Sequence, residues 1–115
     1  MKGLPGSIAV ALVLLLTPTT AWNAPASKSQ LAAQGKAILQ EKCGRCHAVG
    51  PTGASPLRTA PPMRTIYRRF LPRELQAELS EGMVSRHREM PQIEFSDDDV
   101  YAILTYLYAL SKRKQ

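Results

Sequence analysis

The cysteine chemistry of this 115-residue chain is concentrated in one pentapeptide, Cys43-Gly44-Arg45-Cys46-His47 (CGRCH), which holds both of its cysteines. On a helical turn, residues i, i+3 and i+4 share a face, so the two thiols and the imidazole point the same way. The pentapeptide therefore suits a thiol redox pair, part of a metal site or a covalently attached haem. A structural disulfide is a poor alternative, because a bond across two residues would restrain almost no loop.

The spacing favours haem attachment, since C-x-x-C-H is the signal for a c-type haem. Two such sulfurs can form thioethers to the vinyl groups on one porphyrin edge, and the adjacent imidazole can reach the iron. A thioredoxin-like pair would open a helix after a strand, whereas this one follows a predicted helix with no strand before it. A zinc ion needs four ligands, for which His87 would have to be the fourth. We predict one haem c, bound by Cys43 and Cys46, with His47 on the iron.

The N-terminus has the pattern of a secretory signal. Met1-Lys2 provides a short basic start, residues 8–16 (IAVALVLLL) are apolar, and small residues follow up to Ala21 and Ala26. The apolar run is shorter than the roughly 20 residues that span a membrane. We expect residues 1–26 to be a signal, cut after Ala21 or Ala26, and the protein to be periplasmic.

Residues 27–115 would then form a single mono-haem domain. A domain of this size buries a modest core and usually needs a metal, a disulfide or a cofactor. The chain has a net charge of +6, to which the signal contributes only Lys2. For an exported protein, this charge suits docking to an acidic protein or an anionic membrane better than binding nucleic acid.

Apolar periodicity predicts helices over residues 29–42, 72–83 and 97–112, with a short helical turn over 64–70 and no strands. Pro72 suits a first helical turn, Ser96 can cap the last helix, and aspartates beside that cap complement the helix dipole. The expected inward residues are Leu31, Gly35, Ile38 and Leu39, then Leu75, Leu79 and Met83, and finally Val100, Ile103, Leu104 and Leu107. The predicted fold is a small all-α domain with long Pro/Gly loops.

The iron has a second axial position, for which Met63, Met83, His87 and Met90 are the candidates. Met83 continues the apolar stripe of its helix and Met63 follows two prolines, so both are expected to pack in the core. Met90 is an apolar side chain in a polar connector, RHREMPQIEFS, and Pro91 restricts it to an extended backbone. We predict Met90 as the ligand, with His87 as the alternative.

In the order of these features the chain resembles small bacterial class I c-type cytochromes, over almost all of residues 27–115. The resemblance rests on Gly35, CGRCH, the loop 50–62 (GPTGASPLRTAPP), Met90-Pro91 and Tyr106-Leu107. It implies a helical domain wrapped around one covalent haem, with the first and last helices crossing closely at Gly35 and Tyr106. Where such helices often carry an aromatic four residues after the glycine, this chain has Leu39.

The resemblance also implies a loop proline whose carbonyl orients the proximal imidazole, and candidates for it are Pro56, Pro61 and Pro62. Our candidates for groups that meet the haem propionates are Arg64, Tyr67 and Arg68. The loop is shorter than in mitochondrial-type relatives.

Together these features predict an electron carrier that moves one electron between protein redox partners and has no catalytic residues of its own. His/Met ligation would raise the potential of the iron, and a basic surface would orient a transient acidic partner. The candidates for that surface are Arg58, Arg64, Arg68, Arg69 and Arg73. Alternatives are the haem subunit of a two-subunit periplasmic dehydrogenase, a ligand-binding haem sensor and a thiol oxidoreductase; any membrane contact would be peripheral.

Overall fold

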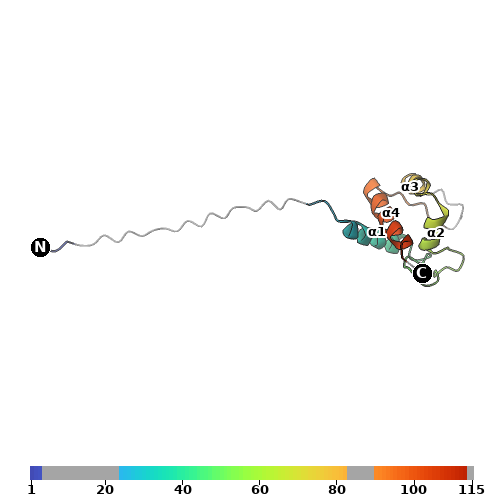
Figure 1. Cartoon of the computed structure of the whole chain (residues 1–115), viewed down its shortest axis with the longest axis horizontal. Coiled ribbons are helices and arrows are strands. Elements are labelled where there is room, and N and C mark those ends of the chain that lie inside the picture. Colours follow the sequence, from blue (N-terminus) through green and yellow to red (C-terminus); the bar gives the residue numbers. More distant parts are fainter. Residues whose placement is uncertain (4–23, 83–89, 114–115) are drawn as a thin grey trace.

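The computed structural model describes residues 1–3, 24–82 and 90–113 (Figure 1). Its elements are the helices α1 (Lys28–Lys42), α2 (Met63–Arg69), α3 (Pro72–Ser80) and α4 (Asp97–Ser111). Strands are absent from these ranges, and the predicted all-α class is confirmed. None of the helices in them is long and apolar enough to cross a membrane. Most of the expected signal, residues 4–23, lies outside the described part of the chain.

Local capping explains where α1 and α4 begin. Ser96 accepts a hydrogen bond from the Asp99 amide at 3.2 Å, as predicted, and the first turn of α4 is acidic. Ser27 caps α1 in the same way, and its own amide donates to Gln30 Oε1 at 2.7 Å. This reciprocal capping box extends α1 by one residue beyond the predicted start.

The predicted end of the third helix at Met83 is wrong, because α3 ends at Ser80. Gly82 adopts a φ of +72°, in the left-handed region that terminates helices, and the Glu81 amide closes the last turn on the Ala77 carbonyl. Pro72 occupies the first turn of α3 as expected. Met83 itself lies outside the described residues.

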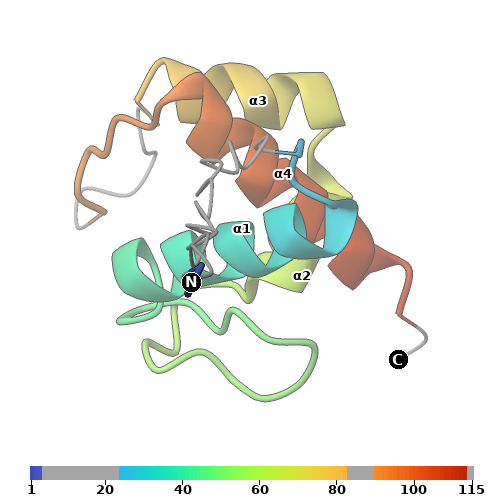
Figure 2. The ribbon, with the colours of Figure 1, turned by 90° about the vertical axis from the view of Figure 1, so that its left-hand side faces the viewer.

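The central helix is α4, which contacts each of the other three helices (Figure 2). Its approach to α1 is closest at Gly35, where a Cβ atom would collide with the Ala102 carbonyl and lie 2.8 Å from the Ile103 amide nitrogen. The predicted crossing of the first and last helices is therefore present, and backbone meets backbone there. Tyr106, one turn further along α4, is buried, and its hydroxyl donates a hydrogen bond to the Val49 carbonyl.

Side chains from every helix meet in one apolar core around α4. Leu75 and Leu79 of α3 and the four inward residues predicted for α4 are buried or half-buried there, and Leu39 of α1 is buried beside them. Met63 at the start of α2 also joins this core, as predicted, and only 6% of its surface is exposed. The buried members are Leu39, Val49, Met63, Leu75, Leu79, Val100, Ile103, Tyr106, Leu107 and Leu110.

Replacing Gly35 with alanine should destabilise the domain, because the added methyl would push α1 away from the α4 backbone. Overpacking of this kind costs about 1–3 kcal/mol, so the thermal midpoint should fall by roughly 4–8 °C per kcal/mol. Thermal unfolding followed by circular dichroism measures it. Gly50→Ala is the matched control, because a Cβ at Gly50 would meet nothing within 4 Å. Equal midpoints for the two variants would contradict the close crossing.

Candidate haem site

The CGRCH pentapeptide continues the end of α1 as a tight turn. The Cys43 amide donates to the Leu39 carbonyl at 2.8 Å, and the Cys46 and His47 amides both donate to the Cys43 carbonyl, at 3.1 and 2.9 Å. The three chemical groups thus start from a backbone that α1 anchors directly. Because α1 is locked against α4, their position relative to the core is set by the helix crossing.

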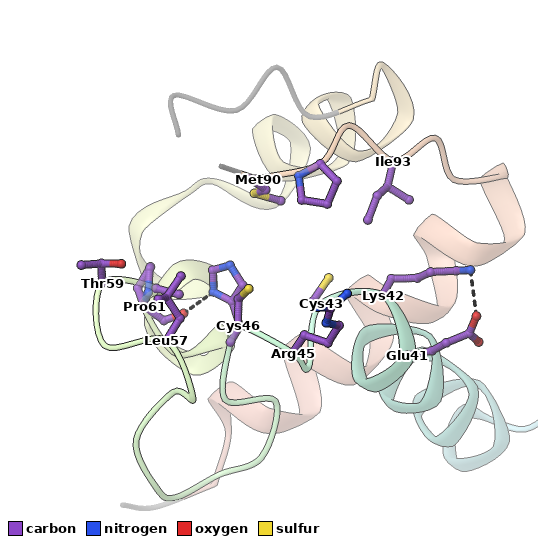
Figure 3. A pocket seen from close by; sticks show the side chains of 13 residues that line it. Glu41, Lys42, Cys43, Arg45, Cys46, Leu57, Thr59, Pro61, Met90 and Ile93 are labelled. Carbon is purple, nitrogen blue, oxygen red and sulfur yellow. Dashed lines mark hydrogen bonds and ion pairs between the residues drawn. The ribbon is translucent and has the colours of Figure 1, made fainter. Parts of the chain in front are cut away.

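This turn forms one wall of a cavity of about 750 Å³, within the range of small-molecule and cofactor sites. Met90 and Ile93 lie across the cavity from Cys43 and Cys46, while Pro61 is on a third side (Figure 3). The lining is Glu41, Lys42, Cys43, Arg45, Cys46, His47, Leu57, Thr59, Ala60, Pro61, Met90, Pro91 and Ile93. Two thiols, an imidazole, a thioether and apolar walls fit the donor set and surroundings that a haem c needs.

The proline carbonyl that orients the imidazole is that of Pro61. Nδ1 of His47 lies 2.6 Å from this oxygen. A carbonyl oxygen can only accept, so Nδ1 carries the proton and donates it, which leaves the lone pair on Nε2. This is the form in which histidine binds a metal, with its other nitrogen held by a backbone partner. Of the three candidates Pro56, Pro61 and Pro62, the fold thus selects the second.

Ala48 and Val49, which follow His47, are held by hydrogen bonds to residues 7 to 57 positions further along the chain. The Tyr106 hydroxyl donates to the Val49 carbonyl at 2.8 Å in a buried hydrogen bond. The Ala48 amide donates to Ser55 Oγ at 3.0 Å, and the Ala48 carbonyl accepts from the Met63 amide at 2.9 Å. Every one of these bonds replaces a partner that regular secondary structure would supply. They fix the backbone that carries His47.

The Cys43 thiol lacks the lowered pKa of a reactive redox thiol. Burial raises the pKa of the Cys43 thiol to about 11, with a further contribution from the neighbouring Cys46. A reactive thiol needs its pKa lowered, because the thiolate is the nucleophile. A zinc site is not supported either: in residues 24–82 and 90–113, no three His, Cys, Asp or Glu side chains are grouped to hold a metal ion. His87, the proposed fourth ligand, lies outside these residues.

Met63 lies in the core as predicted, and the assignment of Met90 as the iron ligand stays a prediction. Met63 is buried in the core, whereas Met90 lines the cavity and is half-buried. Met83 and the rival ligand His87 lie outside the described residues.

The charged groups at the cavity differ from those we expected. Lys42 and Arg45 line it, and Lys42 also pairs with Glu41 at 2.8 Å. Arg64 instead donates to the Gly50 and Gly53 carbonyls, at 3.3 and 2.7 Å, and together with Arg68 it lines a different cavity. Their expected role at the propionates is therefore not supported. The available signal in the sequence was position: Lys42 directly precedes CGRCH and Arg45 lies within it, so both are held close to the attachment turn.

Comparison with known families agrees with this site. Residues 30–107 match the family model described as cytochrome c oxidase, cbb3-type, subunit III. The match begins in α1 and ends in α4, so it includes the CGRCH turn and both crossing helices. A search of curated proteins found no match, and a search of solved structures found none.

Tyr106→Phe should weaken the domain by about 1–3 kcal/mol, because it leaves the buried Val49 carbonyl without its donor. The free energy of unfolding, measured with a chemical denaturant, tests this. Tyr101→Phe is the matched control, since 60% of the Tyr101 surface is exposed. Identical losses in the two variants would contradict a structural role for the Tyr106 hydroxyl.

The stabilities of the Tyr106→Phe and Tyr101→Phe variants should also respond differently to alkaline pH. Burial raises the pKa of Tyr106, and the charge of Arg113 offsets part of that rise. The folded pKa thus exceeds the unfolded value of about 10, so this contribution to stability is present below pH ~10 and is lost as the pH rises further. Tyr106→Phe should lack that component of the alkaline decline, while Tyr101→Phe should retain it.

Proposed function

The chain belongs to the family of the cbb3-type cytochrome c oxidase subunit III domain, a c-type cytochrome domain that binds haem c covalently, and from this we propose that it is a periplasmic electron carrier with His47 and Met90 as axial ligands. One observation carries the proposal: a single cavity has the CGRCH turn on one wall and Met90 on the opposite wall (Figure 3). Cys43 and Cys46 would supply the attachment sulfurs, and His47 and Met90 would supply an imidazole and a thioether to the iron.

Each residue has a distinct role in this proposal. Haem c supplies an iron that exchanges one electron between its ferrous and ferric forms. Cys43 and Cys46 hold the group by thioether bonds, which prevents its loss from a domain too small to enclose it fully. His47 is held in the correct tautomer by Pro61, and the thioether of Met90 favours the ferrous iron and so raises the potential.

The exchange partner is a protein that approaches the rim beside CGRCH. Glu41, Lys42 and Arg45 are exposed at this rim, and their charges sum to one net positive charge. A basic rim accelerates encounter with an acidic partner and lets it leave again, because exposed charges steer more than they bind. Lys42, next to the attachment turn, and Arg45, within it, are therefore the proposed docking cations in place of the arginines 58–73.

A second candidate function comes from the family description, which names a subunit of an oxidase. In that case the chain would pass electrons within a respiratory complex and not diffuse between partners. Co-purification with a catalytic subunit from membranes distinguishes this role, as it would distinguish the dehydrogenase subunit. A carbon monoxide adduct of the reduced protein would instead indicate an open sixth position and a ligand-binding role.

Met90→Ala tests the proposed ligand. We expect the oxidised protein to lose the weak red absorption band of methionine–iron ligation and the potential to fall by roughly 0.1 V or more, since axial ligands set potentials over about 0.8 V. Visible spectroscopy and a redox titration measure both effects. Met63→Leu is the control, because Met63 packs in the core. A variant of Met90 with an unchanged red band would exclude this residue as the ligand.

Mass spectrometry of the denatured protein tests attachment and export together. The intact mass should exceed that of the polypeptide by one haem, and Cys43 and Cys46 should resist alkylation because their sulfurs are in thioether bonds. The mass should also correspond to a chain that begins after Ala21 or after Ala26. If both cysteines are alkylated and the mass of a haem is absent, the pentapeptide is a thiol pair and not a haem attachment site.

A further inference from the structure

A second cavity, of about 190 Å³, is lined by residues of α2 and of the C-terminal end of α4. Its lining contains three arginines and no carboxylate: Arg64, Arg68, Leu110, Ser111 and Arg113. Arg64 and Arg68 are four residues apart and share one face of α2, while Arg113 follows α4. Folding therefore brings together positive charges that are far apart in the sequence.

These charges are not balanced by ion pairs within the described ranges. There, the ion pair that forms is between Lys42 and Glu41, on the rim of the haem cavity. Lys112, next to Arg113, places its ammonium 5.1 Å from the centre of the Tyr108 ring and so interacts with an aromatic face. Three guanidinium groups around one small concavity repel one another, and an anion bound between them would relieve that repulsion.

One of the three arginines is already held in position without a ligand. Arg64 is held by the Gly50 and Gly53 carbonyls, which use two of its five N–H groups and leave three for another acceptor. Leu110 forms a buried apolar floor. The Ser111 hydroxyl donates to the Tyr108 carbonyl at 2.7 Å, so its proton is engaged and the arginines are the donors.

We propose that this cavity binds a phosphate group. Guanidinium ions pair with phosphate in a two-pronged geometry, and donors that converge from α2 and from α4 suit a tetrahedral anion with four oxygens better than a planar carboxylate with two. The volume admits a small oxyanion. The phosphate can come from a free inorganic ion or from the headgroup of a phospholipid, and the chemistry of recognition is the same for both.

Binding at this cavity would stabilise the loop behind the haem site. Arg64 connects the two regions, because its guanidinium lines the cavity and holds the loop carbonyls of Gly50 and Gly53. A ligand that binds only the folded chain raises its stability in proportion to occupancy. Phosphate should therefore protect the holoprotein against unfolding without contacting the haem cavity.

The test is isothermal titration of the full holoprotein with inorganic phosphate, at constant ionic strength set with chloride. We expect one phosphate per chain, with affinity reduced about tenfold or more in Arg68→Gln/Arg113→Gln, because charge-assisted hydrogen bonds are lost. Arg58→Gln/Arg73→Gln removes the same total charge from exposed positions that do not line this cavity, and should bind as the wild type does. Equal affinities for the two double variants would overturn the proposal.

A parallel arm uses vesicles of phosphatidylcholine with and without phosphatidic acid. Vesicle binding that requires phosphatidic acid and is lost in Arg68→Gln/Arg113→Gln, with no uptake of free phosphate, would identify the headgroup as the source. Free phosphate binding without vesicle binding would identify the soluble ion. Binding of a glutamate-rich peptide, with neither form of phosphate bound, would assign the arginines to an acidic protein and contradict the proposal.

Discussion

The backbone contact between α1 and α4 at Gly35 is the constraint on which the rest of the molecule depends. Two helices can approach this closely only where one of them lacks a side chain, and here the Ala102 carbonyl occupies that space. The attachment turn follows α1 without a break, and α4 contacts the other two helices as well. One crossing thus places the cysteines, the proximal histidine and the core in a single frame.

Isolated hydrogen bonds position the long segment after the attachment turn, which has little secondary structure. Residues 46–63 pass around the cavity, and their backbone groups find partners in Ser55, Met63 and Tyr106, among others. These bonds are scattered along the segment and do not form a ladder. Each therefore anchors one point of the backbone, and its loss would release that part of the segment. The His47–Pro61 bond belongs to the same set, which makes the orientation of the imidazole a property of the loop as a whole.

The small size of the domain explains why so much depends on a few contacts. Its core consists of one central helix and the residues packed around it, and a core of that kind supplies limited stability. A covalently attached cofactor would add apolar surface at the large cavity and would couple folding to haem binding, as metal binding does in small metal-binding domains. The polar rim near Lys42 and the arginine cavity near Arg113 then present two different basic surfaces, built from different elements.

The sequence by itself determined the features that depend on neighbouring residues. Helix caps such as Ser96, the spacing in CGRCH and the periodicity of α4 are local, and the helices follow from them with small shifts at their ends. The tertiary structure decided the choice among equivalent residues: Pro61 over Pro56 and Pro62 as the hydrogen-bond partner of His47, and Lys42 and Arg45 over Arg64 and Arg68 in the lining of the large cavity. These choices depend on how a loop without periodicity closes over the helix crossing, and such a path is set by distant contacts that the local pattern does not contain.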